Sequence, residues 1–341
     1  MSKSVAALET PGKGFFVRDD GNALSALQAA THTIQAIYQC PFQAHAPLET
    51  MNCIADVRAD SARIWVPTQC PEEARAEAAK MLGMPLEAVE LQVTLIGGAF
   101  GRRLFADYVY EAVELSRSIA KPVQVIWTRT DDMQCGYFHP SGVERIVAGF
   151  DATRKPIAWA QRSIFSDLSM YGFPSAEDRR DPLHYFNDGM PWGSFDNPYN
   201  FPHLSADLVP LNSPVPTGPW RAVFYPTTVF ARESFLDEMA HYAGQDPLDF
   251  RIRLLQPGNV LQVSDQKIDR SRLIRVLQVV ADKSGWNTPL RHTADHLHGG
   301  EWRATCTTRI VSWLKWLRYR WTGGAAKCGS TAWCALSIVG S

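Results

Sequence analysis

The chain has 341 residues, of which 45% are hydrophobic and 20% charged, so it can bury a sizeable core and is not globally disordered. Its formal net charge of −1 argues against a broad basic surface for nucleic acid. No apolar run approaches the roughly 20 residues that span a bilayer, and Glu9 and Pro11 interrupt any signal-peptide core. We therefore expect a cytoplasmic protein without a transmembrane segment.

The first half of the chain predicts strands and helices in alternation. Pro71 and Gly83 mark the ends of one helix, because proline fits the first helical turn and glycine the left-handed position after the last one. The expected strands span residues 33–39, 61–67, 89–96 and 123–128, and the expected helices span residues 71–82 and 105–119. This order indicates a mixed α/β or α+β domain.

The second half begins with a long segment of different character. Residues 166–228 are rich in Pro, Gly, Asn, Asp and aromatic residues and have few periodic runs, so we expect a long, ordered loop region there. Helical periodicity then returns from Thr228 to the glycine at 244. Two further helices are expected, one up to Leu255 and one from Asp269 to Ser284.

Residues 291–341 differ in composition from the rest of the chain. They hold seven basic residues but only two acidic ones, and five of the eleven tryptophans, and they lack strand-like alternation. One interpretation is a basic, Trp-rich tail that binds a partner. We favour another, a frameshift near residue 290 followed by out-of-frame translation. The domain boundaries that we expect are therefore 1–24, a leader of uncertain status, 25–290, one domain, and 291–341, the atypical tail.

The seven cysteines are odd in number and include no Cys-x-x-Cys pair. The sequence therefore supports no disulfide framework, no structural zinc site and no iron–sulfur cluster held by this chain alone. We expect most of the thiols to be reduced and packed in the interior.

The segment Gly97-Gly98-Ala99-Phe100-Gly101-Arg102-Arg103 lies between an expected strand and an expected helix. A glycine turn at such a place lets backbone N–H groups point at a ligand, and two arginines can grip phosphate, so we expect an anionic cofactor. The segment is neither Gly-x-Gly-x-x-Gly nor a Walker loop. The alternative is a tight structural turn with arginines on the surface.

A second group of polar residues occupies a turn bounded by prolines. Gln43, His45 and Glu49 lie within Pro41–Thr50, among apolar neighbours. Buried polar groups need partners, so these residues form either a hydrogen-bonded knot or part of a site. Taken alone, the pattern favours a knot.

Arg221 carries the third signal. It follows Gly218-Pro219-Trp220, among bulky apolar residues, where a cation needs an anion because an unpaired charge is costly to bury. That anion is either a ligand or a carboxylate on the next helix, Glu233 or Asp237.

Taken together and in this order, the motifs Gln43-Ala44-His45-Ala46-Pro47-Leu48-Glu49, Gly97-Gly98-Ala99-Phe100-Gly101 and Gly218-Pro219-Trp220-Arg221 resemble the molybdenum hydroxylases. This is the xanthine dehydrogenase and aldehyde oxidoreductase family, and the beta subunit of isoquinoline 1-oxidoreductase looks closest. The resemblance covers about residues 25–288. It implies an α+β fold, the first of two molybdopterin-binding domains, in a fragment of a larger subunit whose N-terminal portion and second domain are missing.

The resemblance also implies a cofactor, a reaction and a set of contacts. The cofactor is molybdopterin with molybdenum, expected in its cytosine dinucleotide form, and a small partner subunit carries the iron–sulfur clusters. The intact enzyme hydroxylates an aldehyde or an N-heterocycle with oxygen from water. Gln43 would donate its amide to an oxygen ligand of molybdenum, and Arg221 would approach the pterin. Gly98, Phe100 and Gly101 complete the expected cofactor-binding residues, and no residue of the chain ligates the metal directly.

The chain departs from the family pattern at two places. Leu104 stands where purine-oxidising members carry a glutamate, so a purine is not the expected substrate. The family's catalytic glutamate belongs to a region that this chain does not have, so the catalytic residue is unknown and the chain alone is expected to be inactive. Two alternatives remain: a non-catalytic scaffold, and a nucleotide-dependent enzyme that uses the loop Gly97–Arg103.

Overall fold

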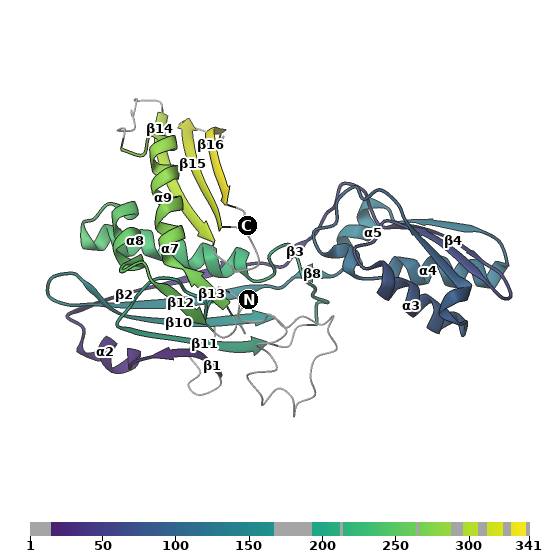
Figure 1. Ribbon diagram of the computed structural model, residues 1–341, viewed down its shortest axis with the longest axis horizontal. Helices are drawn as coiled ribbons and strands as arrows, with labels where there is room; N and C mark the ends of the chain where they lie inside the picture. The colour runs from purple at the N-terminus through teal and green to yellow at the C-terminus, as the bar shows by residue number, and fades with distance from the viewer. Residues whose placement is uncertain are drawn as a thin grey trace.

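The computed structural model describes residues 15–166, 193–211, 214–263 and 266–287, and the backbone of three strands between residues 296 and 338. Two lobes are joined by a narrow connection that contains the short strands β3 (Gln43–Ala44) and β8 (Phe138–His139) (Figure 1). The small lobe is formed by a four-stranded sheet with α3 and α4, and the large lobe by a five-stranded sheet with α2, α7, α8 and α9. The fold is α+β, as predicted.

The small lobe has its helices on one face of the sheet, in the strand order β6-β5-β4-β7. The strands are β4 (Asn52–Val57), β5 (Ala62–Val66), β6 (Val89–Val93) and β7 (Val123–Ile126), and the helices are α3 (Pro71–Leu82), α4 (Asp107–Ile119), α5 (Arg129–Gln134) and the short η1 (Leu86–Ala88) and η2 (Arg102–Leu104). Tyr108, Val109 and Ala112 lie on one stripe of α4 and are fully buried. They pack with Ala55 and Ile64 of the sheet, which is why this lobe has its own core.

The large lobe is built on the strand order β1-β11-β10-β9-β2. Its strands are β1 (Phe15–Asp20), β2 (His32–Cys40), β9 (Gly142–Phe150), β10 (Pro156–Ser166), β11 (His203–Leu211) and the hairpin β12 (Val260–Val263) and β13 (Gln266–Asp269), and its helices are α2 (Ala23–Ala29), α7 (Tyr225–Ala243), α8 (Pro247–Leu255) and α9 (Arg270–Ser284). Strands β10 and β11 are parallel, and the other neighbours in the five-stranded sheet are antiparallel. Phe235 and Met239 of α7 pack with Trp159 of β10 in the main core.

The structure confirms the strands expected near residues 33–39, 61–67, 89–96 and 123–128, and all five helices, within a few residues at each end. The prediction of a loop over residues 166–228 is wrong at β11 and from Tyr225, where α7 begins, and it is confirmed for residues 193–202 and 214–224, which contain no helix and no named strand. The rest of the segment, residues 167–192, lies outside the described residues. The described part of the expected leader, residues 15–24, forms β1 and the start of α2, which continues to Ala29, and β1 pairs with β11.

Residues 296–338 also differ from the expectation. The backbone forms three antiparallel strands, β14 (His296–Thr305), β15 (Ser312–Thr322) and β16 (Gly329–Ile338), although the sequence there shows no strand alternation. The sheet lies beside α9 in Figure 1. Its side chains are not described, so the origin of the tail stays a prediction.

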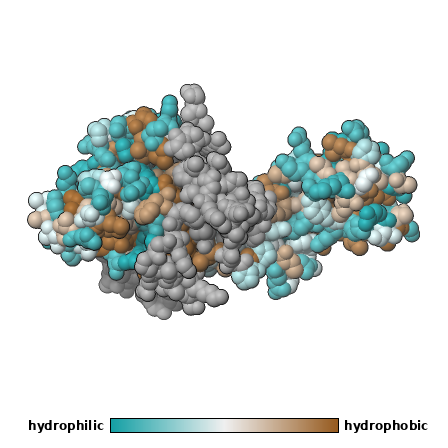
Figure 2. All heavy atoms as spheres, turned by 90° about the horizontal axis from the view of Figure 1, so that it is seen from below, coloured by the Kyte–Doolittle hydropathy of each residue, from teal (hydrophilic) through white to brown (hydrophobic). Residues whose placement is uncertain are grey.

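The small lobe exposes apolar side chains beside the glycine loop. Leu48 is 92% exposed and Leu95 is 95% exposed, and their segments are joined by a hydrogen bond of 3.0 Å from Glu49 N to the carbonyl of Gly97. Figure 2 shows this lobe projecting from the rest of the molecule, with hydrophobic and hydrophilic residues side by side on the visible face. The described residues therefore leave this edge of the small lobe open. No helix in the described part of the chain has the length and hydrophobicity to cross a bilayer.

Candidate functional site

The three motif segments meet where the two lobes join. His45 of the first segment contacts the third segment, with Nε2 at 3.0 Å from the carbonyl oxygen of Pro219, and its Nδ1 lies 3.1 Å from the carbonyl oxygen of Tyr137. A backbone hydrogen bond of 2.8 Å runs from Arg221 N to the carbonyl of Phe100 and joins the third segment to the glycine loop. The structure thus brings together residues that lie far apart in the sequence.

The close approach of two loops explains why residue 101 is glycine. Gly101 has φ +102°, and a Cβ atom there would overlap the carbonyl oxygen of Pro219. Its N–H donates to Gln69 Oε1 at 3.0 Å. A side chain would therefore force the two loops apart.

The same loop presents backbone donors without partners. Within the described ranges, no acceptor meets the N–H groups of Gly98, Ala99 and Phe100. Gly98 and Phe100 have φ values of +103° and +56°, so the backbone turns in an unusual conformation here. Successive N–H groups in such a turn can form a concave binding site for an anion or an electronegative ligand atom.

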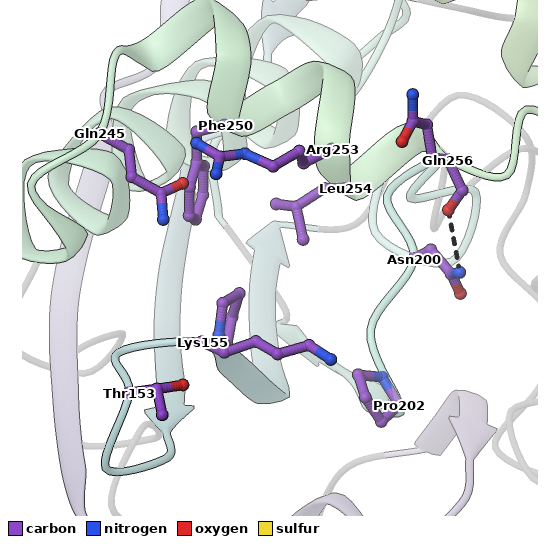
Figure 3. A pocket seen from close by; sticks show the side chains of 10 residues that line it. Thr153, Lys155, Asn200, Pro202, Gln245, Phe250, Arg253, Leu254 and Gln256 are labelled. Carbon is purple, nitrogen blue, oxygen red and sulfur yellow. Dashed lines mark hydrogen bonds between the residues drawn. The ribbon is translucent and has the colours of Figure 1, made fainter.

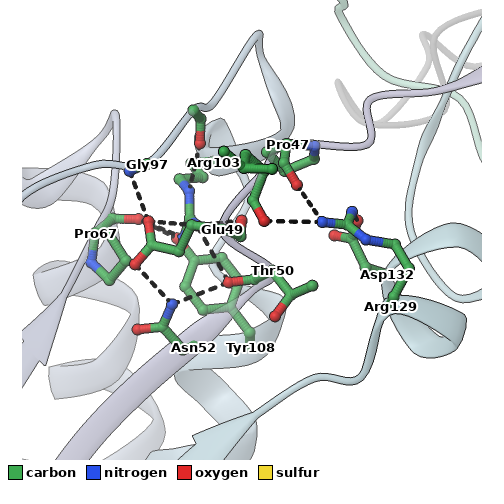
Figure 4. Close-up of polar contacts among 12 residues, drawn as sticks. Pro47, Glu49, Thr50, Asn52, Pro67, Gly97, Arg103, Tyr108, Arg129 and Asp132 are labelled. Atoms are coloured by element: carbon green, nitrogen blue, oxygen red, sulfur yellow. Dashed lines mark hydrogen bonds and ion pairs between the residues drawn. The ribbon is translucent and has the colours of Figure 1, made fainter.

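Arg103 is not on the surface and is not available to a ligand. It is fully buried, and it donates to the carbonyl oxygens of Gly98 at 2.9 Å and Pro67 at 3.0 Å (Figure 4). Its Nη2 lies 3.0 Å from Glu49 Oε2, and this carboxylate oxygen also accepts from Gly97 N at 2.7 Å. Arg103 and Glu49 therefore hold the two ends of the glycine loop.

Arg102 is also buried and bonded to its neighbours in the interior. Its guanidinium forms two parallel hydrogen bonds with Asp107, of 2.9 and 2.6 Å. Four aromatic rings surround it, and the nearest, that of Trp127, has its centroid 5.2 Å from Cζ. Both expectations for this pair, phosphate binding and surface exposure, are wrong. The nucleotide-dependent alternative rested on these arginines, so it loses its support.

Arg221 has the opposite environment. It is exposed, and its guanidinium Cζ lies 5.3 Å from the centroid of the Phe100 ring. Among the described residues, no carboxylate lies within 4 Å of it. The predicted ion pair with Glu233 or Asp237 is wrong, because both carboxylates bind Arg251. Arg221 is therefore a cation that forms no ion pair within the described ranges, and it lies over the ring of Phe100 in the glycine loop.

The polar residues of the Gln43 segment have separate environments. Gln43 pairs with His139 between β3 and β8, and its side chain is exposed. His45 is buried between two carbonyl oxygens and Glu49 binds Arg103, so both have partners, but the described hydrogen bonds do not join the three side chains into the expected knot. Burial lowers the pKa of His45 below its usual 6.5, although the two carbonyls favour the protonated form. His139 is buried as well, and burial lowers its pKa in the same way.

Sequence reasoning missed the residues that shape the loop. Gln69 fixes Gly101 N, Asp107 neutralises Arg102, and Glu49 holds Gly97. Glu49 was visible in its motif, whereas Gln69 lies in a connecting segment without any motif. Within the described chain, no group of three or more His, Cys, Asp or Glu side chains could hold a metal ion.

Comparison with known proteins assigns the sequence to a family. Residues 8–255 match the family described as "Molybdopterin cofactor-binding domain". Isoquinoline 1-oxidoreductase subunit beta of Brevundimonas diminuta is 29% identical over 255 residues, which cover 73% of this chain and 30% of the relative. The membrane-bound aldehyde dehydrogenase [pyrroloquinoline-quinone] of Gluconacetobacter polyoxogenes is 29% identical over 284 residues, or 80% of this chain and 36% of the relative.

A solved structure agrees at the level of the fold. Quinoline 2-oxidoreductase from Pseudomonas putida 86 superposes with a TM-score of 0.64 at 18% identity, over 83% of this chain and 37% of that one. The chain spans about a third of the length of the curated relatives it matches. Because the family match covers well over half of the chain, the chain belongs to the molybdopterin cofactor-binding domain family of xanthine dehydrogenase-type molybdenum hydroxylase subunits.

Proposed function

We propose that this chain supplies one wall of a molybdopterin site in an oxidoreductase that hydroxylates an aldehyde or an N-heterocycle. One observation carries the proposal: the loop whose N–H groups at Gly98–Phe100 meet no described acceptor also holds the guanidinium of Arg221 over its Phe100 ring, and no described carboxylate pairs with that guanidinium. Such a cluster of donors fits a ligand rich in acceptor atoms and negative charge, which is the chemistry of a pterin dithiolate bearing a phosphate.

Five residues form this wall: Gln43, Gly98, Phe100, Gly101 and Arg221. The loop residues would donate backbone N–H groups, Arg221 would add a positive charge, and Gln43 would donate its amide to an oxygen ligand of the metal. Gly101 contributes differently from the others, since its own N–H is used by Gln69, and its role is to allow the close approach of Pro219. When bound, the cofactor supplies the redox chemistry and the activation of water, and the chain positions it.

The base of the reaction lies outside these residues. Hydroxylation needs a group that takes a proton from the attacking oxygen, and the resemblance to the molybdenum hydroxylases implies a glutamate for this purpose in a second cofactor domain. The buried histidines, His45 and His139, are engaged with backbone carbonyls and do not fit this role. We therefore propose that the chain by itself does not turn over a substrate.

The proposal extends to the partner and to the form of the cofactor. A small iron–sulfur subunit would accept the electrons, the cofactor would be the cytosine dinucleotide form, and the cytoplasm would be the compartment. The exposed side chains of Leu48 and Leu95 beside the loop support a further protein surface at this place, because large exposed apolar residues that cluster mark interaction sites.

Residues 291–341 give the proposal its first test. We propose that they are translated out of frame, and the encoding DNA beyond the codon for Leu290 is therefore read in all three frames. A frame that continues with a second family domain and its glutamate supports the proposal. If no frame does so, the tail is genuine sequence and the non-catalytic scaffold becomes the better hypothesis.

The second test addresses the wall itself. Gln43→Ala and Arg221→Ala are introduced into the subunit extended in frame, expressed with its iron–sulfur partner, and molybdenum and pterin are measured per mole of protein. We expect a lower cofactor content or turnover in both variants and no change in the control Arg63→Ala, an exposed position on the sheet of the small lobe. Unchanged cofactor content and unchanged turnover in both variants would show that these residues do not contact the cofactor.

A further inference from the structure

A cavity lies in the large lobe, away from the junction of the motif segments. Its volume is about 590 Å³, within the range of small-molecule sites. It opens between the turn that joins β9 to β10, the segment before β11, and helix α8. In Figure 1 these elements lie at the end of the large lobe that is remote from β3 and β8, so the cavity is separate from the proposed cofactor wall.

The cavity combines an apolar floor with cations. Phe250 and Leu254 of α8 are buried beneath it, with exposed fractions of 2% and 8%. Arg253 enters from α8 and Lys155 from the opposite wall, and Leu254 lies between them (Figure 3). Among the described residues, no acidic side chain lines the cavity. Two positive charges therefore face one apolar surface.

Neither cation forms an ion pair within the described part of the chain. No carboxylate there lies within 4 Å of the guanidinium of Arg253 or the ammonium of Lys155. Lys155 interacts with Asp151 at longer range, because hydrogen bonds from Thr153 and Lys155, and then the charge of Lys155, lower the pKa of that carboxyl. The hydrogen bond that Arg253 makes is a long one of 3.4 Å, from Nε to the carbonyl of Asp249 on its own helix. The terminal nitrogens of both side chains remain available to an anion.

The walls of the cavity are fixed by hydrogen bonds. Asn200 N donates to the carbonyl of Leu254 at 2.7 Å, and Asn200 Nδ2 donates to the carbonyl of Gln256 at 3.3 Å. In the opposite wall, Asp151 Oδ1 accepts from the N–H groups of Thr153 and Lys155 at 2.8 and 3.0 Å. Preformed walls reduce the ordering that binding requires.

We propose that this cavity is a ligand site, distinct from the proposed molybdopterin site, for a small organic anion with two carboxylates on a flat apolar body. The apolar body would lie on Phe250 and Leu254, and the two carboxylates would meet Lys155 and Arg253. The side-chain amides of Gln245 and Gln256 line the same cavity and can orient the carboxylate oxygens. This site does not depend on the proposed molybdopterin site.

Isophthalate is a suitable probe, and its binding to the isotopically labelled chain is followed by NMR and calorimetry. Isophthalamide has the same ring without charge, and inorganic phosphate has charge without the ring. We expect isophthalate to shift the amide signals of Phe250 and Leu254 and to bind more tightly than either control. Binding that shifts only signals elsewhere, or equal binding of isophthalamide, would overturn the proposal.

Substitutions distinguish isophthalate binding in this cavity from binding at other positively charged sites. Lys155→Gln and Arg253→Gln should each weaken isophthalate binding about tenfold, the loss of about 1.4 kcal/mol expected for a charge contact. Both side chains are exposed, so the fold should not change, and Lys80→Gln on α3 is the matched control. Unchanged affinity in the double variant contradicts the proposal, as does loss of binding in Arg221→Ala, which would place the anion at the other site.

Discussion

The two loops that meet between the lobes use arginine in opposite ways. In the loop Gly97–Arg103, both arginines are buried and each is paired with a carboxylate, Asp107 or Glu49. In the segment around Arg221, the arginine is exposed and has no carboxylate among the described residues. The first loop therefore uses its charges to fix its own shape, while the second leaves its charge open to a ligand. Proximity of an arginine to a glycine loop does not by itself indicate a phosphate site.

Substitution of a buried arginine should have the largest effect on the stability of the protein. Arg103→Leu eliminates the hydrogen bonds to Gly98 and Pro67 and leaves Glu49 without its cation. We expect a loss of about 3–5 kcal/mol in the free energy of unfolding, measured by urea denaturation. Arg63→Leu is the control, since its ion pair with Glu90 is exposed and should contribute at most about 1 kcal/mol. Equal losses in the two variants would mean that Arg103 does not hold the loop.

Disruption of the contact between the two loops should lower the stability of the protein almost as much. In Gly101→Ala the new methyl group overlaps the carbonyl of Pro219, and φ is positive, so we expect a loss of at least about 2 kcal/mol. Gly83→Ala is the matched control, because φ is +67° but no atom lies within 4 Å of the new Cβ, and only about 1 kcal/mol of backbone strain is expected. The two unfolding curves should differ. If they coincide, the close approach at Pro219 is not present in solution.

In the large lobe, the buried carboxyl of Glu144 has no cation as an ion-pair partner among the described residues. Burial raises the pKa of Glu144 from 4.5 to about 8, and its Oε2 accepts hydrogen bonds from Gln161 and Ser163. The folded state then holds the proton more tightly than the unfolded state, so stability falls as the pH rises from 4.5 to about 8. The slope from this group is at most about 1.4 kcal/mol per pH unit.

Glu144→Gln should remove this component of the pH dependence. Thermal unfolding is followed between pH 5 and pH 8, with Glu90→Gln at an exposed position as the control. Above about pH 6.5, the usual pKa of histidine, the lowered pKa values of His45 and His139 add no loss, because their effect on stability lies on the acidic side. A wild-type curve that is flat or rising between pH 6.5 and pH 8 would contradict the assignment.

Arg221→Ala should have the smallest effect on stability. The side chain is exposed and contacts only the ring of Phe100 in the described structure, so we expect a change within about 0.5 kcal/mol. The same substitution is expected to lower cofactor content in the extended subunit. A large loss of stability would instead show that both loops use arginine to hold their structure.

Much of the fold could be read from local patterns, and most of the site could not. The ends of α3 and α9 follow from Pro71, Gly83 and Gly285, whose preferences act locally. Strand β11 was missed although Leu204 and Leu208 alternate with polar residues, because the prolines and aromatic residues around it suggested a loop. Strands β9 and β10 were not predicted either, since buried polar residues interrupt their apolar pattern.

The site depends on contacts between distant residues. The three motif segments were identified from their residue types, and their convergence follows from the pairing of β3 with β8 and from the contacts of His45. The burial of Arg102 and Arg103 could not be predicted, because their partners are set by the packing of α4 and the turn at Glu49. The same holds for the open N–H groups of Gly98, Ala99 and Phe100, because they depend on the loop conformation, with positive φ at Gly98 and Phe100, and on where the neighbouring segments place their acceptors.

The contact between Gly101 and Pro219 also constrains how this protein can change over generations. The two residues belong to loops from different parts of the chain, yet a larger residue at the first position requires a new path for the second loop. An insertion or deletion in either loop would be tolerated only with a compensating change in the other. The lengths of the two segments are therefore coupled, and a comparison of many relatives should find them varying together.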